Sequence, residues 1–292
     1  MADIFFSVII PAYNAEAYIG EAIESVLLQN QVKPEIVVVD DGSTDDTIKI
    51  INGFKGDIKV LTQKNSGSSS ARNNGVKVAN GNMIAFLDAD DVWLPSKLMT
   101  QQRKIDNGFE MVYTNRMNIG DKGDLPEIQT DIEEMPEGDI FNSLLYGNVI
   151  TNSSVVIAKK RFTELGGFRS DILDCEDWDL WLRYAANHAI GFCPEPMVKY
   201  RVHSNNKGKS YQRQNSSRIN IVTSILGNDR CRSLTGQERR KVLSNTFSTC
   251  AWATARNGNL PCALNLYLKA LIQCPFRGGT WYDVARALTG RI

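Results

Sequence analysis

The sequence has few of the features that mark zinc proteins, secreted proteins or membrane proteins. It contains only two histidines, His188 and His203, which argues against a zinc site built from imidazole ligands. No apolar run approaches the roughly 20 residues that a membrane-spanning helix needs. The first residues are acidic rather than basic, and the apolar run that follows is too short for a signal peptide. We therefore expect no targeting or transmembrane segment.

Charge and cysteine content further narrow the class of protein to which the chain can belong. Lys and Arg number 33, as do Asp and Glu, so the formal net charge is zero and a broad nucleic-acid footprint is not expected. All six cysteines lie in the second half, without Cys-x-x-Cys spacing. Without a secretory signal we interpret them as reduced thiols. The sequence predicts a soluble, cytoplasmic protein that does not bind nucleic acid.

The first hundred residues alternate between short apolar runs and helical stripes. Strands are expected over residues 7–10, 35–39, 59–61 and 81–87, and helices over 15–29, 48–51 and 71–79. Continuous apolar strands separated by helices predict an α/β fold, with a parallel sheet covered on both faces. In such sheets, ligands bind at the carboxyl ends of the strands.

The pattern changes after about residue 105. Strands are expected over residues 111–113 and 155–158, a helix over 178–186, and an acidic surface loop over 120–138. Beyond residue 205 the strands stop, and helical patterns such as 244–255 and 262–272 dominate. We therefore predict three parts: an α/β half over 1–105, a second half over 106–205 and a helical extension over 206–292.

Two carboxylates follow the fourth expected strand. Asp88 and Asp90 are two residues apart, so at a strand end they project the same way. Their mutual repulsion favours a positive occupant. Mg²⁺ or Mn²⁺ takes oxygen ligands and usually shares its coordination shell with substrate phosphates. An Asp-x-Asp element is common by chance, so its weight depends on the motifs around it.

Four segments, in order along the chain, carry a family resemblance. Residues 7–14, 39–47, 65–73 and 86–91 together resemble family 2 glycosyltransferases. The resemblance covers roughly residues 5–205 and implies the GT-A fold, in which a Rossmann-like nucleotide-binding half is fused to an acceptor-binding half. Such a resemblance fixes fold and reaction type far better than it fixes the sugar.

The resemblance assigns the nucleotide to the first two strand ends. Tyr13, which follows Pro11, would stack on a uracil ring; the alternative is packing on a neighbouring loop. Asp41 would accept a hydrogen bond from the base's ring N–H, and Asp40 would serve the loop or the ribose. The alternative is that Asp40 and Asp41 provide only turn and cap chemistry. The choice of UDP rests on the resemblance alone.

The resemblance assigns the diphosphate to a Gly/Ser loop. The loop from Asn65 through Gly67 lets the backbone approach a ligand closely, and it leads into a helix N-terminus that favours anions. Arg72 would supply forked hydrogen bonds to the diphosphate or nucleotide. A solvated surface arginine is the alternative.

The last donor-side motif is assigned to the metal. Asp90 would ligate Mn²⁺ or Mg²⁺ directly, Asp88 would face the ribose and the metal, and Ala89 between them belongs to the donor site. His203 matches a family segment in which a histidine reaches the metal or diphosphate, and its imidazole suits Mn²⁺ better than Mg²⁺. The alternative for His203 is a satisfied or exposed polar side chain.

An acidic segment in the second half resembles the acceptor side of the family. There an aspartate at a helix start acts as general base, and Asp177 is the residue that matches. Such a base typically contributes about 10²–10⁴-fold in rate. Glu176 and Asp179 are competitors, and an acidic first turn is also favourable helix electrostatics.

The resemblance implies an inverting, metal-dependent single displacement from a nucleotide-sugar to a saccharide or lipid-linked saccharide, in a setting such as bacterial surface polysaccharide synthesis. No Gln-x-x-Arg-Trp element is present, so we expect a non-processive enzyme. A nucleotidyltransferase would carry a Gly- and Arg-rich loop where residues 11–14 stand. A non-catalytic nucleotide-binding protein would lack the base or the metal ligand. A phosphoacceptor signalling domain would need neither Asp88-x-Asp90 nor the Glu176-Asp177 segment.

The C-terminal extension has no assigned role. Residues 275–292 mix aromatic and aliphatic side chains with arginines, which fits an interfacial helix in peripheral contact with a membrane. A core-packed terminal helix fits the same residues, and the helices expected from residue 220 onward also fit a lid or a homo-oligomer contact.

Overall fold

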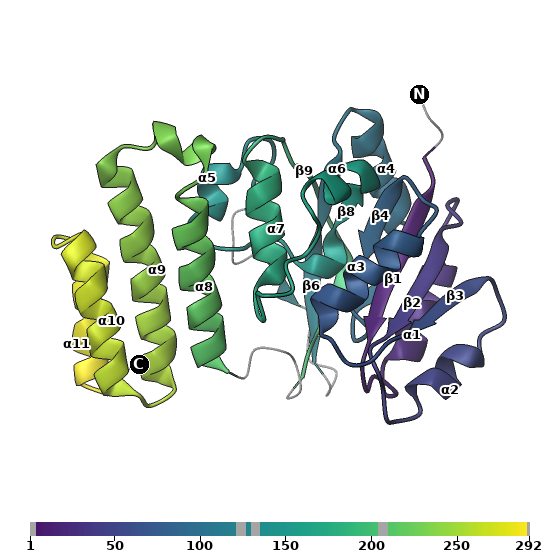
Figure 1. The fold of residues 1–292 in the computed structure, drawn as a ribbon, viewed down its shortest axis with the longest axis horizontal. Coiled ribbons are helices and arrows are strands. Elements are labelled where there is room, and N and C mark those ends of the chain that lie inside the picture. The colour runs from purple at the N-terminus through teal and green to yellow at the C-terminus, as the bar shows by residue number, and fades with distance from the viewer. Residues whose placement is uncertain (1–3, 121–126, 130–134, 204–209, 291–292) are drawn as a thin grey trace. The chain divides into compact units, whose positions relative to one another are not determined.

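The structure is a computed structural model that describes residues 4–120, 127–129, 135–203 and 210–290. The chain forms two compact units (Figure 1). The first, called the α/β unit here, comprises residues 1–140, 148–170 and 176–204. The second, called the helical unit, comprises Phe141–Gly147, Asp171–Cys175 and Asn205–Ile292. Both parts expected before residue 205 therefore contribute to one α/β unit.

One mixed sheet forms the centre of the α/β unit. Its order is β3-β2-β1-β4-β8-β6-β9-β5, with β7 beside β6 (Figure 1). β1 is parallel to β2 and β4, β2 is parallel to β3, and β8 is antiparallel to β4 and β6. The strands are β1 (Phe6–Ala12), β2 (Glu35–Asp40), β3 (Ile58–Thr62), β4 (Met83–Phe86), β5 (Val92–Trp93), β6 (Met111–Gly120), β7 (Glu127–Ile128), β8 (Val156–Ala158) and β9 (Gly191–Val202).

Helices cover both faces of the parallel strands, which explains why these strands are continuously apolar. Val8 and Ile10 pack on one face with Ile19 and Val26 of the first helix. On the opposite face Gly75 lies so close that an added Cβ would stand 2.5 Å from Ile9 Cγ2. The helices of this unit are α1 (Ile19–Leu27), α2 (Thr47–Asn52), α3 (Ser68–Val78), α4 (Lys97–Asp106), α6 (Lys159–Glu164) and α7 (Glu176–Ala185).

Several boundaries differ from those expected. The first helix begins at Ile19 rather than Ala15. In front of α2, the Asp45 carboxylate accepts the Thr47 backbone N–H at 3.0 Å, whereas the N-cap residue Asp46 makes no capping bond with its side chain. The expected acidic loop over 120–138 starts inside β6 and contains β7. Residues 121–126 and 130–134 of that loop lie outside the described residues.

The helical unit contains the helices expected beyond residue 205. Beyond residue 205 the structure has α8 (Tyr211–Ile225), α9 (Gly236–Arg256), α10 (Leu260–Gln273) and α11 (Gly278–Leu288), and the short helix α5 (Phe141–Leu144) also belongs to this unit. Thr235 and Glu238 form a capping box at the start of α9, and Asn259 caps α10. Ala251, Ala263 and Tyr267 belong to the small core between these helices. Within the described residues, no helix is both long and apolar enough to cross a bilayer.

Candidate functional site

The carboxyl ends of β1, β2 and β4 meet at one edge of the sheet. The register places Ala12 opposite Asp40 and Ile9 opposite Phe86, so Tyr13, Asp41 and Asp88 follow strands that end side by side. Tyr13 is half-exposed, whereas Asp40 and Asp41 are buried. This edge borders the strand-order reversal at which α/β sheets bind ligands.

Asp41 organises the loop that leads into α3. Its carboxylate oxygens accept hydrogen bonds from Gln63 Nε2 at 2.7 Å and from the backbone N–H groups of Ser66 and Gly67, both at 2.8 Å. The side chain therefore fixes the position of the Gly/Ser loop. A hydrogen bond from Asp41 to a nucleotide base stays a prediction, as do ligand contacts by Pro11, Tyr13 and Asn65.

The Asp40 side chain stabilises the turn that directly follows it. Its carboxylate accepts the backbone N–H groups of Gly42 and Ser43, all at 3.3 Å. Gly42 has a φ of 80°. A Cβ there would lie 3.1 Å from the Asn65 backbone nitrogen, so both φ and the close approach require glycine. These contacts fit the turn alternative for Asp40.

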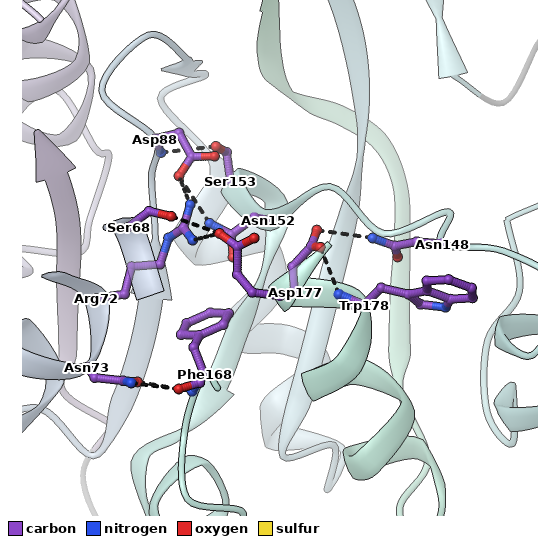
Figure 2. Close-up of polar contacts among 11 residues, drawn as sticks. Ser68, Arg72, Asn73, Asp88, Asn148, Asn152, Ser153, Phe168, Asp177 and Trp178 are labelled. Atoms are coloured by element: carbon purple, nitrogen blue, oxygen red, sulfur yellow. Dashed lines mark hydrogen bonds and ion pairs between the residues drawn. The ribbon is translucent and has the colours of Figure 1, made fainter. Parts of the chain in front are cut away.

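Asp88 lies where three segments meet (Figure 2). Its Oδ1 accepts hydrogen bonds from Arg72 Nη2 at 2.6 Å and from Asn152 Nδ2 at 3.2 Å. Its backbone N–H donates to Ser153 Oγ at 3.1 Å. The side chain of Asp88 keeps 28% of its surface exposed.

Asp90 and His203 come together from distant parts of the sequence. Asp90 Oδ2 lies 3.1 Å from His203 Nε2, and the imidazole stacks on Tyr18 at a ring distance of 5.1 Å. Burial and the charge of Asp88 raise the pKa of Asp90, while His203 acts in the opposite direction. A cation beside Asp88 and Asp90 would offset the repulsion between the two carboxylates, which fits a divalent metal ion.

These residues fit a metal that shares its shell with a ligand. Among the described residues, no cluster of three or more His, Cys, Asp or Glu side chains is arranged to hold a metal ion. Asp90 and His203 form a pair, and Asp88 is drawn toward Arg72. Mg²⁺ and Mn²⁺ commonly bind through one or two protein ligands plus substrate phosphate oxygens, so a pair is sufficient for that kind of site.

Arg72 is buried and joins two carboxylates, so the surface-arginine alternative is wrong. Its Nη1 donates to Glu176 Oε1 at 2.8 Å, and its Nη2 donates to Asp88 (Figure 2). The guanidinium carbon lies 5.3 Å from the centre of the Phe168 ring. Burial alone would lower the pKa of Arg72, but the charges of Asp88 and Glu176 outweigh burial and raise it. Within the described residues, its buried Nε–H has no acceptor.

The three acids at the start of α7 have different surroundings. Glu176 Oε1 accepts hydrogen bonds from Ser68 Oγ and from Arg72, both at 2.8 Å. Asp179 forms a 2.7 Å ion pair with Arg183. Asp177 forms no ion pair within the described part of the chain. The local geometry therefore separates Asp177 from its two competitors.

Asp177 is held by uncharged donors. Its Oδ2 accepts a hydrogen bond from Asn148 Nδ2 at 3.0 Å, and its Oδ1 accepts the Trp178 backbone N–H at 2.7 Å (Figure 2). Burial, followed by the charge of Glu176, raises the pKa of Asp177 to about 7. A carboxyl group with that pKa can take up and release a proton near neutral pH.

Sequence reasoning did not find the residues that hold these carboxylates. Asn148 supports Asp177, while Asn152 and Ser153 contact Asp88. Asn152 and Ser153 belong to a 3₁₀ turn, Asn152–Ser154, directly before β8. A run of small polar residues before a buried strand was the available signal. Nothing near Asn148 in the sequence points to Asp177.

A family model described as glycosyl transferase family 2 matches residues 7–163. A relative in Escherichia coli is the UDP-Glc:alpha-D-GlcNAc-diphosphoundecaprenol beta-1,3-glucosyltransferase WfgD. The two are 34% identical over 223 residues, which cover 73% of this chain and 85% of the relative.

The chain spans only part of some other relatives. An uncharacterized glycosyltransferase of Rickettsia felis is 35% identical over 203 residues, which are 68% of this chain but 33% of the relative. Among solved structures, Staphylococcus aureus TarS residues 1–349 superposes with a TM-score of 0.71 at 22% identity, covering 99% of this chain and 89% of that one. The same TarS fragment has been solved in complex with UDP-GlcNAc.

Proposed function

The chain belongs to glycosyl transferase family 2 and is a glycosyltransferase with the GT-A fold, and we propose that it transfers one sugar per binding event, with inversion, from a UDP-sugar to a saccharide hydroxyl. The observation that carries this proposal is the environment of Asp177. It is the one acid among Glu176, Asp177 and Asp179 without an ion pair in the described residues, and its pKa is raised to about 7.

The donor would occupy the edge formed by the ends of β1, β2 and β4. Tyr13 is exposed enough to stack on a base, and the Asn65–Gly67 loop is fixed by Asp41 at the N-terminus of α3. Oriented N–H groups at a helix start favour the phosphates of a nucleotide. TarS, which shares this fold, has been solved with UDP-GlcNAc, and WfgD takes its name from UDP-Glc.

A divalent cation would be held by Asp90 and His203, with Asp88 facing the same ligand and the donor diphosphate completing the shell. Mn²⁺ or Mg²⁺ bound there would neutralise charge that develops on the departing diphosphate. Arg72 keeps one oxygen of Asp88 engaged and so holds this carboxylate in position.

Asp177 would act on the acceptor. It takes the proton from the attacking hydroxyl while the acceptor oxygen forms a bond to the anomeric carbon and the bond from that carbon to the diphosphate oxygen breaks. One displacement from the face opposite the leaving group inverts the anomeric configuration. The beta-1,3 linkage in the WfgD name is the product that such a displacement gives with an α-linked donor.

We propose the class of acceptor from the relatives alone. WfgD acts on GlcNAc linked to diphosphoundecaprenol, and we extend that class, a lipid-linked saccharide, to this chain. Bacterial surface polysaccharide synthesis is the setting that such an acceptor implies. A lipid-linked acceptor would bring the enzyme to a membrane surface, through contacts of the C-terminal helices. A homo-oligomer remains an expectation from the sequence.

Two other functions are weaker. A non-catalytic nucleotide-binding protein would have no reason to keep a carboxyl of raised pKa at the start of α7. A nucleotidyltransferase would carry glycine and arginine after β1, where Pro11, Ala12, Tyr13 and Asn14 stand.

Calorimetry tests the donor site first. UDP, GDP and dTDP would be titrated into the full chain with and without Mn²⁺. We expect UDP to bind best, to need Mn²⁺, and to bind at least about tenfold more weakly to Asp90→Asn, because one metal ligand is lost. The matched control is Asp57→Asn, an exposed carboxylate in the same unit. Absence of nucleotide binding under every condition would contradict the proposal.

A further inference from the structure

The zero net charge of the chain conceals a strong separation of charge. Residues 1–204 contain 19 Lys and Arg against 30 Asp and Glu. Residues 205–292 contain 14 Lys and Arg against 3 Asp and Glu. All of this basic segment belongs to the helical unit. Charge asymmetry of this size is typical of a surface that binds a polyanion or an anionic membrane.

Part of this charge surrounds a hollow in the helical unit. The hollow has a volume of about 810 Å³ and lies between α9 and the turn that joins α10 to α11. Arg240 and Lys241 of α9 and Arg277 of the turn line it, and the lining residues include no carboxylate. Arg277 donates to Asn245 Oδ1 at 2.8 Å, which holds the turn against α9. Within the described residues, none of these three cations forms an ion pair.

The same turn and the two helices that it joins expose apolar side chains. Phe276 is 99% exposed, Ile272 is 66% exposed, and both line the hollow. Trp281 is 54% exposed, and its Nε1–H donates to the Pro275 carbonyl at 2.8 Å, so the indole is fixed beside the turn. An aromatic ring that projects fully into water buries none of its apolar surface, and such clustering marks a binding surface.

We propose that the helical unit binds an anionic lipid bilayer through this surface, defined here as the basic turn surface: Arg240, Lys241, Ile272, Phe276 and Arg277. The cations would contact lipid phosphates while Phe276 and Ile272 enter the boundary between head groups and acyl chains. Lipid fits better than nucleic acid because exposed aliphatic side chains such as Ile272 gain nothing from phosphates or bases. The proposal extends the proposed function, since a lipid-linked acceptor lies at a bilayer, but its test needs no transfer reaction.

The test measures binding of the full chain to vesicles of phosphatidylcholine, with and without phosphatidylglycerol, by co-sedimentation. We expect binding only with phosphatidylglycerol, and weaker binding as salt is raised. Each basic residue near an anionic surface contributes about fivefold, so Arg240→Gln/Lys241→Gln/Arg277→Gln should lose roughly 100-fold in partitioning. Arg240→Gln/Lys241→Gln, which leaves the bond from Arg277 to Asn245 intact, should lose roughly 25-fold.

Matched controls separate the surface from total charge. Lys33→Gln/Lys55→Gln/Lys160→Gln removes three exposed cations from the α/β unit and should change partitioning less than about twofold. Phe276→Ser should weaken binding without changing charge. Asp177→Asn should bind vesicles like the unchanged chain, so a failure of the transfer reaction would not be mistaken for a failure of this proposal.

Four results would overturn the proposal. One is equal partitioning to both vesicle types, or to neither. A second is equal loss in the α/β control and in the triple variant of the basic turn surface. A third is a concentration-dependent dimer, seen by light scattering and abolished by Phe276→Ser, because the surface would then bind a second copy of the chain. Tight binding of single-stranded RNA that depends on the same three cations, without vesicle binding, would assign the surface to nucleic acid.

Discussion

At the scale of a single side chain, Asp177 combines partial burial with uncharged hydrogen-bond donors. As a general base it must be ionised, so the rate should fall about tenfold per pH unit below its pKa of about 7. The hydrogen bond from Asn148 stabilises the ionised form. Asn148→Ala should therefore raise this pKa and move the acidic limb of kcat/KM upward by about one pH unit.

The measurement is kcat/KM for sugar transfer between pH 5 and 9. Asn187→Ala, an exposed amide in the same unit, is the matched control and should leave the profile unchanged. Asp177→Asn should lose about 10²–10⁴-fold in rate above pH 7, with a smaller loss at lower pH, while UDP binding persists. A wild-type profile that stays flat through pH 7 would show that Asp177 is not the base.

At the scale of secondary-structure elements, Arg72 of α3 links the end of β4 to the start of α7. Replacing it in Arg72→Met would leave Asp88 and Glu176 without their shared cation, at a cost of about 3–5 kcal/mol in the free energy of unfolding. Urea denaturation measures this loss. Adding Glu176→Gln to Arg72→Met should recover part of it, because one unpaired charge is removed.

Arg161→Met is the matched control for this prediction. Arg161 also joins two carboxylates, those of Glu110 and Glu164, but its side chain is 26% exposed. Water screens such pairs, so Arg161→Met should lower the free energy of unfolding far less than Arg72→Met does. Equal losses for Arg72→Met and Arg161→Met would mean that the buried bridge has no special role in stability.

The elements predicted from the sequence are those with a strong local pattern. β1, β2 and β4 were found because their residues are continuously apolar. β9 was missed because Pro194 and Pro196 interrupt it, and its register against β6 shifts next to Asn115. Pairing with the long strand β6 keeps β9 extended despite the two prolines. The residues of β9 alone do not reveal that pairing.

The site shows the same division between local and distant information. Motif matches singled out Asp88, Asp90, Asp177 and His203, and the structure brings Asp90 and His203 together across 113 residues. The side chains that hold the carboxylates were not predictable, because Asn148 and Asn152 carry no local signature. Their role depends on where the turn before β8 and the start of α7 meet the sheet.

At the scale of the whole molecule, the helical unit is not built from the C-terminal segment alone. Phe141–Gly147 and Asp171–Cys175 also belong to it. Arg213 of α8 pairs with Asp174 at 3.3 Å, and Asn245 of α9 donates to the Tyr146 carbonyl at 3.0 Å. Within this unit, the C-terminal helices therefore bind segments that precede residue 204 in the chain.

Ending the chain after Ser204 tests this interdependence. Phe141, Leu144 and Leu145, each at most 1% exposed, would lose partners in the helical unit. Burial of such side chains contributes about 1.5–3 kcal/mol each, a total comparable to the stability of an average domain. The truncated chain should therefore bind a hydrophobic dye and unfold at a lower urea concentration than the full chain. Adding Phe141→Ser/Leu144→Ser/Leu145→Ser to the truncated chain should reduce the dye binding. A truncated chain with an unchanged urea midpoint would mean that residues 205–292 are a separable appendage, whose function then depends only on the surface that it presents.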